Sequence, residues 1–88
     1  MLVKNLNGTA DNKAPYGYIS WLDFWEKKSG KKAHECAHCR AKAKVGAHVQ
    51  KAFMEDRRWF IVPLCEKCNK TPSSDVFAVY EELVPVRD

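Results

Sequence analysis

The sequence predicts a small α+β domain held together by a metal ion, and three features carry this prediction. The chain has 88 residues, which is enough for one domain but gives only a marginal core. Its four cysteines form two pairs, each with two residues between the partners. One amphipathic helix precedes the first pair, and an alternating strand pattern lies between the pairs.

The N-terminal residues 1–15 are polar and rich in turn signals. Asn7-Gly8 and Ala14-Pro15 are dipeptides that favour turns. We therefore expect residues 1–15 to form a partly mobile arm, and residues 16–88 to form a single zinc-binding domain.

A helix is expected to begin after Ser20 and to end at Gly30. Ser20 and Asp23 have the spacing of a capping box, and Gly30 suits the left-handed residue that ends a helix. The helix places three aromatic residues on one face: Trp21, Phe24 and Trp25. Such a stripe usually packs into a core, and we expect it to cover the zinc module. A platform for stacking nucleic-acid bases is the alternative.

The region between the cysteine pairs predicts an antiparallel hairpin. Apolar and polar residues alternate in 44–51, and 59–64 is an apolar run, so these are the two expected strands. Residues 65–70 are expected to form a tight turn and a short helical turn, which Pro72 ends. Residues 76–80 fit a helix or a strand, and their β-branched and aromatic side chains favour the strand.

The cysteines are the strongest functional signal in the chain. A two-residue spacer lets both sulfurs of a pair reach one tetrahedral zinc ion, and two such pairs complete its coordination. The predicted ligands are Cys36, Cys39, Cys65 and Cys68. A redox-active pair would require a βαβ context, which the pattern lacks. His34 precedes the first pair and His38 lies within it, and we interpret both as exposed neighbours rather than ligands.

The charge distribution indicates a polyanion as a candidate partner. The net charge is +4, and basic residues cluster in 27–44. The candidate contacts to DNA or RNA are Lys31, Lys32, Arg40, Lys42 and Lys44. A lysine-rich solvated surface without a partner is the equal alternative. No apolar run is long enough to span a membrane, and no secretory signal is visible, so the expected location is the cytoplasm.

The order of cysteine pair, hairpin, second pair and short helix resembles a treble-clef zinc finger. Two sequence segments further resemble the HNH-endonuclease family: Gly46-Ala47-His48-Val49 and Ile61-Val62-Pro63-Leu64-Cys65-Glu66-Lys67-Cys68-Asn69. That resemblance implies His48 as a general base and Asn69 as a ligand of a catalytic metal. The family's metal-binding residue before the histidine is replaced here by Ala47, and its central asparagine is missing.

Two functions therefore follow from the sequence. The favoured one is a non-catalytic module with structural zinc that contacts nucleic acid or a protein partner. The alternative is a small HNH-type, metal-dependent endonuclease that uses His48. As a non-catalytic residue, His48 is expected on the polar face of the hairpin.

Overall fold

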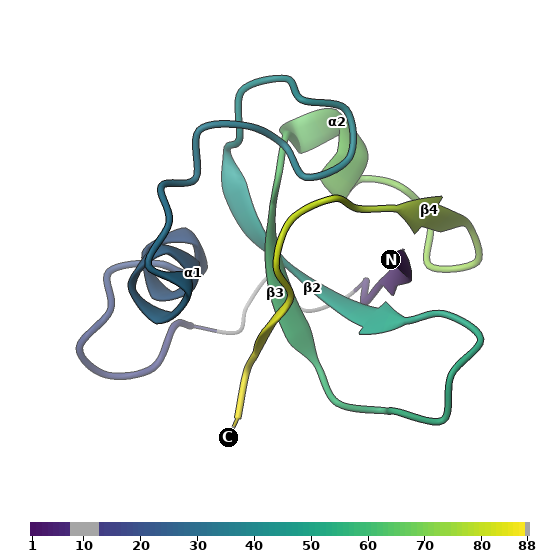
Figure 1. The fold of residues 1–88 in the computed structure, drawn as a ribbon, viewed down its shortest axis with the longest axis horizontal. Coiled ribbons are helices and arrows are strands. Elements are labelled where there is room, and N and C mark those ends of the chain that lie inside the picture. The colour runs from purple at the N-terminus through teal and green to yellow at the C-terminus, as the bar shows by residue number, and fades with distance from the viewer. Residues whose placement is uncertain (8–12, 88) are drawn as a thin grey trace.

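The computed structural model describes residues 1–7 and 13–87. Within these residues an α+β fold is formed by a five-stranded antiparallel sheet and two helices (Figure 1). The strand order is β4-β1-β2-β3-β5. The elements are β1 (Leu2–Asn5), α1 (Trp21–Ser29), β2 (Val45–Lys51), β3 (Phe60–Leu64), α2 (Glu66–Asn69), β4 (Val76–Ala78) and β5 (Val84–Pro85).

The β2–β3 hairpin divides the core into two apolar clusters. The strands pair in the register Ala47↔Val62 and His48↔Ile61, and successive side chains point to opposite faces of a sheet. Val62 belongs to the cluster that contains Cys36, Cys65 and Cys68. Ile61, on the other face, packs with Phe24 and Trp25 of α1. Figure 1 accordingly shows α1 and α2 on different sides of the hairpin.

Helix α1 begins and ends where the sequence predicts. The hydroxyl of Ser20 accepts a hydrogen bond from the backbone N–H of Asp23, and Gly30 adopts a left-handed φ of 76°. Phe24 and Trp25 are buried, and they pack against Ile61 of β3 and Val84 of β5. The aromatic stripe is thus part of the core, but it covers the sheet face opposite the cysteines rather than the cysteines themselves.

The N-terminal segment differs from the expected arm. Leu2–Asn5 forms strand β1, which lies between β2 and β4 inside the sheet. Val3 is fully buried and Asn5 almost so. The prediction of an arm over residues 1–15 is therefore wrong for this strand. The sequence does not show the alternation because the apolar Leu2 is exposed and the polar Asn5 is buried. Residues 8–12, also assigned to the arm, lie outside the described residues.

The C-terminal region adds the two edge strands. Val76–Ala78 is strand β4, so the preference for a strand in 76–80 is confirmed over a shorter range. Val84–Pro85 forms β5 beside β3, a strand that the sequence analysis did not predict. Each edge strand pairs with one neighbour, so the β2–β3 hairpin and β1 remain in the interior of the sheet.

Candidate metal centre

The first cysteine pair lies on a tight turn, residues 36–39, which we call the first knuckle. The backbone N–H of Cys36 donates to the carbonyl of Ala41 at 2.6 Å, and Arg40 N–H donates to the carbonyl of Cys36 at 3.1 Å. Arg40 has a left-handed φ of 70°, which reverses the chain directly after Cys39. Ala37 N–H then donates to the carbonyl of Pro63 at 2.8 Å, so the knuckle is attached to β3.

The second pair lies at the start of α2, and residues 65–68 form the second knuckle. Cys65 caps the helix, and its Sγ accepts a hydrogen bond from the backbone N–H of Cys68 at 3.4 Å. The equivalent bond in the first knuckle joins Cys36 Sγ and His38 N–H, also at 3.4 Å. Both knuckles thus direct backbone N–H groups at sulfur, which stabilises a thiolate.

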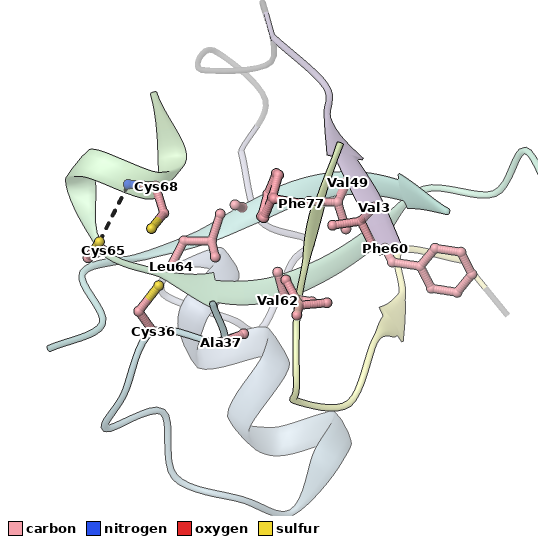
Figure 2. Close-up of a cluster of buried hydrophobic side chains, with 12 residues drawn as sticks. Val3, Cys36, Ala37, Val49, Phe60, Val62, Leu64, Cys65, Cys68 and Phe77 are labelled. Carbon is pink, nitrogen blue, oxygen red and sulfur yellow. Dashed lines mark hydrogen bonds between the residues drawn. The ribbon is translucent and has the colours of Figure 1, made fainter. Parts of the chain in front are cut away.

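Together the two knuckles gather four sulfurs into one cluster. The Sγ atoms of Cys36, Cys39, Cys65 and Cys68 all lie within 4.8 Å of one another, and none of these cysteines forms a disulfide. Figure 2 shows the side chains of Cys36, Cys65 and Cys68 close together beside Leu64. Cys39 is exposed, whereas the other three are buried.

The spacing of the sulfurs fits a tetrahedral metal ion. With zinc–sulfur bonds of about 2.3 Å, tetrahedral geometry requires sulfurs about 3.8 Å apart. The Sγ atoms of Cys39 and Cys65 are 3.6 Å apart. A disulfide has a sulfur–sulfur bond of only about 2.0 Å. The cluster therefore has the size of a metal site and is too open for a covalent bond at this pair.

The electrostatics of the cluster already favour one thiolate. Burial alone would raise the pKa of the Cys36 thiol, but hydrogen bonds from backbone N–H groups, foremost that of Cys39, lower it to about 6. Burial raises the pKa of the Cys68 thiol, and contact with the other sulfurs raises it further. A bound cation would favour the thiolate form at all four positions.

The histidines beside the first knuckle do not join the sulfur cluster. The cluster of potential ligands within the described residues comprises the four cysteines. His38 Nδ1 lies 2.6 Å from the carbonyl oxygen of Ala78, and its ring packs edge-on against Phe77. His38 thus connects the knuckle to β4, while His34 is exposed.

Asn5 supports the second knuckle, and the sequence analysis did not identify it. Its Nδ2 group lies within hydrogen-bond distance of three carbonyl oxygens, at 3.1 Å from Cys68, 3.4 Å from Asn69 and 3.0 Å from Thr71. The Cys68 carbonyl also accepts from the backbone N–H of Thr71 at 3.1 Å, so Asn5 is an additional, side-chain donor just where α2 ends. Nothing in the local sequence marks this role, because it depends on the pairing of β1 with β2.

The expectation that His48 lies on a polar face is wrong. Helix α1 covers that face, so His48 is only 7% exposed. Its ring lies between Trp21 and Trp59, with centroid distances of 4.7 and 5.7 Å. Burial lowers the pKa of His48. His48 and the exposed Asn69 line the same cavity, which also borders β1 and the start of α1.

The predicted basic residues are all exposed, but two of them lie near acidic partners. Lys31 lies 3.8 Å from a carboxylate oxygen of Glu82, and Arg40 lies 3.6 Å from one of Glu35. Lys32 borders a small hollow with Asp23 and Glu26. Among the described residues, Lys32, Lys42 and Lys44 are the members of the set without a carboxylate at ion-pair distance.

Two further findings concern membrane-spanning helices and similarity to known proteins. In the part of the chain that the structure describes, no helix has the length and apolar character needed to cross a membrane. Comparison of the chain with protein-family models, with curated proteins and with solved structures gives no match. The assignment therefore rests on the geometry itself: a small α+β domain whose four clustered cysteines are positioned to hold a metal ion.

Proposed function

We propose that the chain is a non-catalytic zinc module in which Cys36, Cys39, Cys65 and Cys68 bind one structural Zn²⁺. The observation that carries the proposal is the gathering of four Sγ atoms within 4.8 Å of one another. Four thiolates are the set that structural zinc prefers, and they leave no coordination position for a substrate. The arrangement of knuckle, hairpin and second knuckle supports a treble-clef-like description.

The metal has a defined mechanical role in this proposal. The first knuckle is hydrogen-bonded to Pro63 of β3, and the second follows β3 directly. A zinc ion would join the two knuckles and close one end of the hairpin. Zinc bound to such sites contributes about 10–16 kcal/mol at neutral pH, which exceeds the net stability of a typical small domain.

The zinc proposal is tested by measuring the zinc content of the protein and by removing a ligand or the metal itself. The purified chain should contain one zinc per molecule by elemental analysis. Cys65→Ser should leave it largely unfolded, whereas Ala41→Ser, an exposed change in the same turn region, should keep both the metal and the fold. A well-dispersed NMR spectrum after exhaustive chelation would contradict a structural role.

We further propose that this module contacts nucleic acid through its basic surface. The supporting observation is that Lys42 and Lys44, on the segment that leaves the first knuckle, are exposed and form no ion pair within the described residues. The other predicted contacts, Lys31, Lys32 and Arg40, lie near carboxylates that offset their charge. Binding should therefore be weak, directed to phosphate and insensitive to base sequence.

The salt dependence of binding tests this contact. On duplex DNA the log–log slope of affinity against salt is about −0.9 per neutralised phosphate. Changing Lys42 and Lys44 together to Ala should flatten the slope by up to about two units. Changing the matched pair Lys27 and Lys28, on α1, together to Ala should flatten the slope less. If the chain binds no nucleic acid even at low salt, a protein partner becomes the leading proposal.

The nuclease alternative is supported by one observation and opposed by another. His48 and Asn69 line one cavity, as a shared catalytic site would require. However, His48 Nε2 is covered from solvent, and Ala47 offers no metal ligand. Incubating plasmid DNA with the chain and Mg²⁺ or Mn²⁺, beside His48→Ala, separates the two functions. Nicking that disappears in the variant would establish the nuclease.

A further inference from the structure

A cavity of about 790 Å³ lies between the end of β1, the start of β2 and the N-terminal end of α1. Its volume falls within the range of about 300–1,000 Å³ that is typical of small-molecule sites. It lies apart from the sulfur cluster, because no cysteine contributes to its wall. The proposed zinc site therefore does not explain why this cavity is present.

Two buried polar side chains in the wall of this cavity lack a hydrogen-bond partner. Asn5 is 2% exposed and His48 is 7% exposed. Neither Asn5 Oδ1 nor His48 Nε2 has a partner within the described part of the chain. Buried polar atoms are normally hydrogen-bonded, because an unsatisfied one costs free energy. Both atoms lie beneath the wall of this one cavity, so the protein leaves polar groups unsatisfied directly beside it.

The charge of the wall favours an anion. Lys13 and Lys44 both line the cavity, and none of the lining residues that the structure describes is acidic. Neither lysine forms an ion pair within the described residues. Elsewhere in the molecule, Lys27, Lys31 and Lys51 each lie near a carboxylate. Among the residues that the structure describes, the positive charge at this cavity thus has no carboxylate partner.

Another part of the wall is apolar and limits the ligand further. Tyr18, Ile19, Trp21 and Leu22, from the approach to α1 and its first turn, line it. Ile19 is 92% exposed at present, so a bound apolar group would shield it from water. A ligand matching both walls needs an apolar part on one side and an oxyanion group on the other.

We propose that this cavity binds a small organic anion with a flat apolar part, of the size of a nucleotide. The apolar part lies against the wall of residues 18–22, and the oxyanion group lies near Lys13 and Lys44. Free metabolites and the end of a nucleic-acid strand both offer this chemistry.

NMR titration of the full-length, isotope-labelled protein with defined probes tests the site. The probes are AMP and 1-naphthoate, compared with adenosine, which lacks the anion, and inorganic phosphate, which lacks the apolar part. At least one of AMP and 1-naphthoate should shift the side-chain signals of Asn5 and His48. Adenosine and phosphate should each bind at least tenfold more weakly than AMP if AMP is the probe that binds.

Matched variants assign any binding to the cavity. Lys13→Ala and Lys44→Ala should each weaken binding by up to about fivefold, the usual effect of one partly exposed charge. Lys28→Ala and Lys70→Ala remove the same charge outside the cavity and should change nothing. Ala14→Phe adds a ring to the cavity wall without changing charge and should abolish binding while the zinc content stays the same.

The outcomes are decisive in both directions. If neither AMP nor 1-naphthoate shifts Asn5 and His48, or if the cavity lysines and their controls behave alike, the proposal is overturned. A 5′-phosphorylated single strand that binds more tightly than AMP identifies a nucleic-acid end as the source of the anion. Tighter binding of AMP identifies a free metabolite. Both comparisons use the folded protein as purified and depend on the cavity residues, whereas the metal proposal is tested by zinc content and chelation, so the two stand or fall separately.

Discussion

The side-chain amide of Asn5 donates a 3.1 Å hydrogen bond to the backbone carbonyl of Cys68, which is 63 residues away in the sequence. It thereby joins the first strand of the chain to one of the four clustered cysteines. Figure 2 shows Val3 of the same strand packed beside Val49 and Phe77. The N-terminal strand is thus coupled both to the sheet and to the second knuckle.

Removing this link should destabilise the domain measurably. Asn5→Ala removes the side-chain donor to the carbonyls of Cys68 and Thr71, of which Cys68 keeps the backbone N–H of Thr71. Loss of hydrogen bonds to buried groups costs about 1–3 kcal/mol. Asn69→Ala is the matched control, because Asn69 contributes only its backbone carbonyl to this network. Its unfolding free energy should stay within about 0.5 kcal/mol of wild type. Equal denaturation midpoints for the two variants would contradict the role of Asn5.

Trp25 should contribute more to stability than any exposed aromatic residue. It is 1% exposed, and its Nε1–H donates to the carbonyl of Glu82 at 2.8 Å. Trp25→Ala should lower the free energy of unfolding by about 3–5 kcal/mol, the usual cost of removing a buried aromatic ring. Tyr16→Ala removes a fully exposed ring and should have almost no effect. A small effect of Trp25→Ala in urea denaturation would show that α1 does not depend on this contact.

Gly46 should not tolerate a side chain. A Cβ atom at this position would lie 2.5 Å from the carbonyl carbon of Trp21 and 2.6 Å from the backbone nitrogen of Leu22. Helix α1 would have to move, so Gly46→Ala should cost at least about 1–3 kcal/mol. Gly30→Ala meets no atom within 4 Å but has a φ of 76°, and should cost about 1 kcal/mol. Thermal denaturation of both variants is the measurement. If Gly30→Ala lowered the melting temperature more than Gly46→Ala, the close approach of Gly46 to the backbone of α1 would be refuted.

His48 should make the domain less stable as the pH falls. Burial lowers the pKa of His48 in the folded state below its ordinary value of 6.5, whereas the unfolded chain takes up a proton near that value. Protons therefore bind preferentially to the unfolded state, and stability decreases below about pH 6.5. His48→Phe removes this contribution.

The measurement is the change in unfolding free energy between about pH 7.5 and pH 5.5, two values on either side of the usual histidine pKa. Wild type should lose more stability over this interval than His48→Phe. Protonation of the cysteines contributes to both proteins, so the difference between them isolates His48. The exposed His34 provides the control, and His34→Gln should follow wild type. A wild-type curve parallel to that of His48→Phe would show that His48 is not buried as a neutral ring.

Helix α1, the two cysteine knuckles and strand β2 could be predicted from the sequence, because the residues that determine each of them lie within a few positions of one another. Ser20, Asp23 and Gly30 determine the ends of α1 through contacts within the helix itself. The two cysteine pairs predict their own turns, because two intervening residues suffice to form each knuckle. The alternation in 44–51 likewise predicted β2, with Ala47 and His48 on opposite faces.

Long-range arrangement required the tertiary structure, since it depends on partners distant in the sequence. Residues 2–5 carry only two apolar side chains, and they form a strand because β2 and β4 supply its hydrogen bonds on both sides. His48 is polar and follows a strand period, so only the position of α1 reveals that it is buried.

The sequence by itself determined the number and spacing of the cysteines, the helix and the hairpin, because each depends on neighbours within a few residues. The tertiary structure decided that the four sulfurs meet, that Asn5 supports the second knuckle, and that a basic cavity forms beside His48. Each of these depends on how α1 and β1 pack against the hairpin. That packing is set by the burial of side chains from distant segments, which no local pattern encodes.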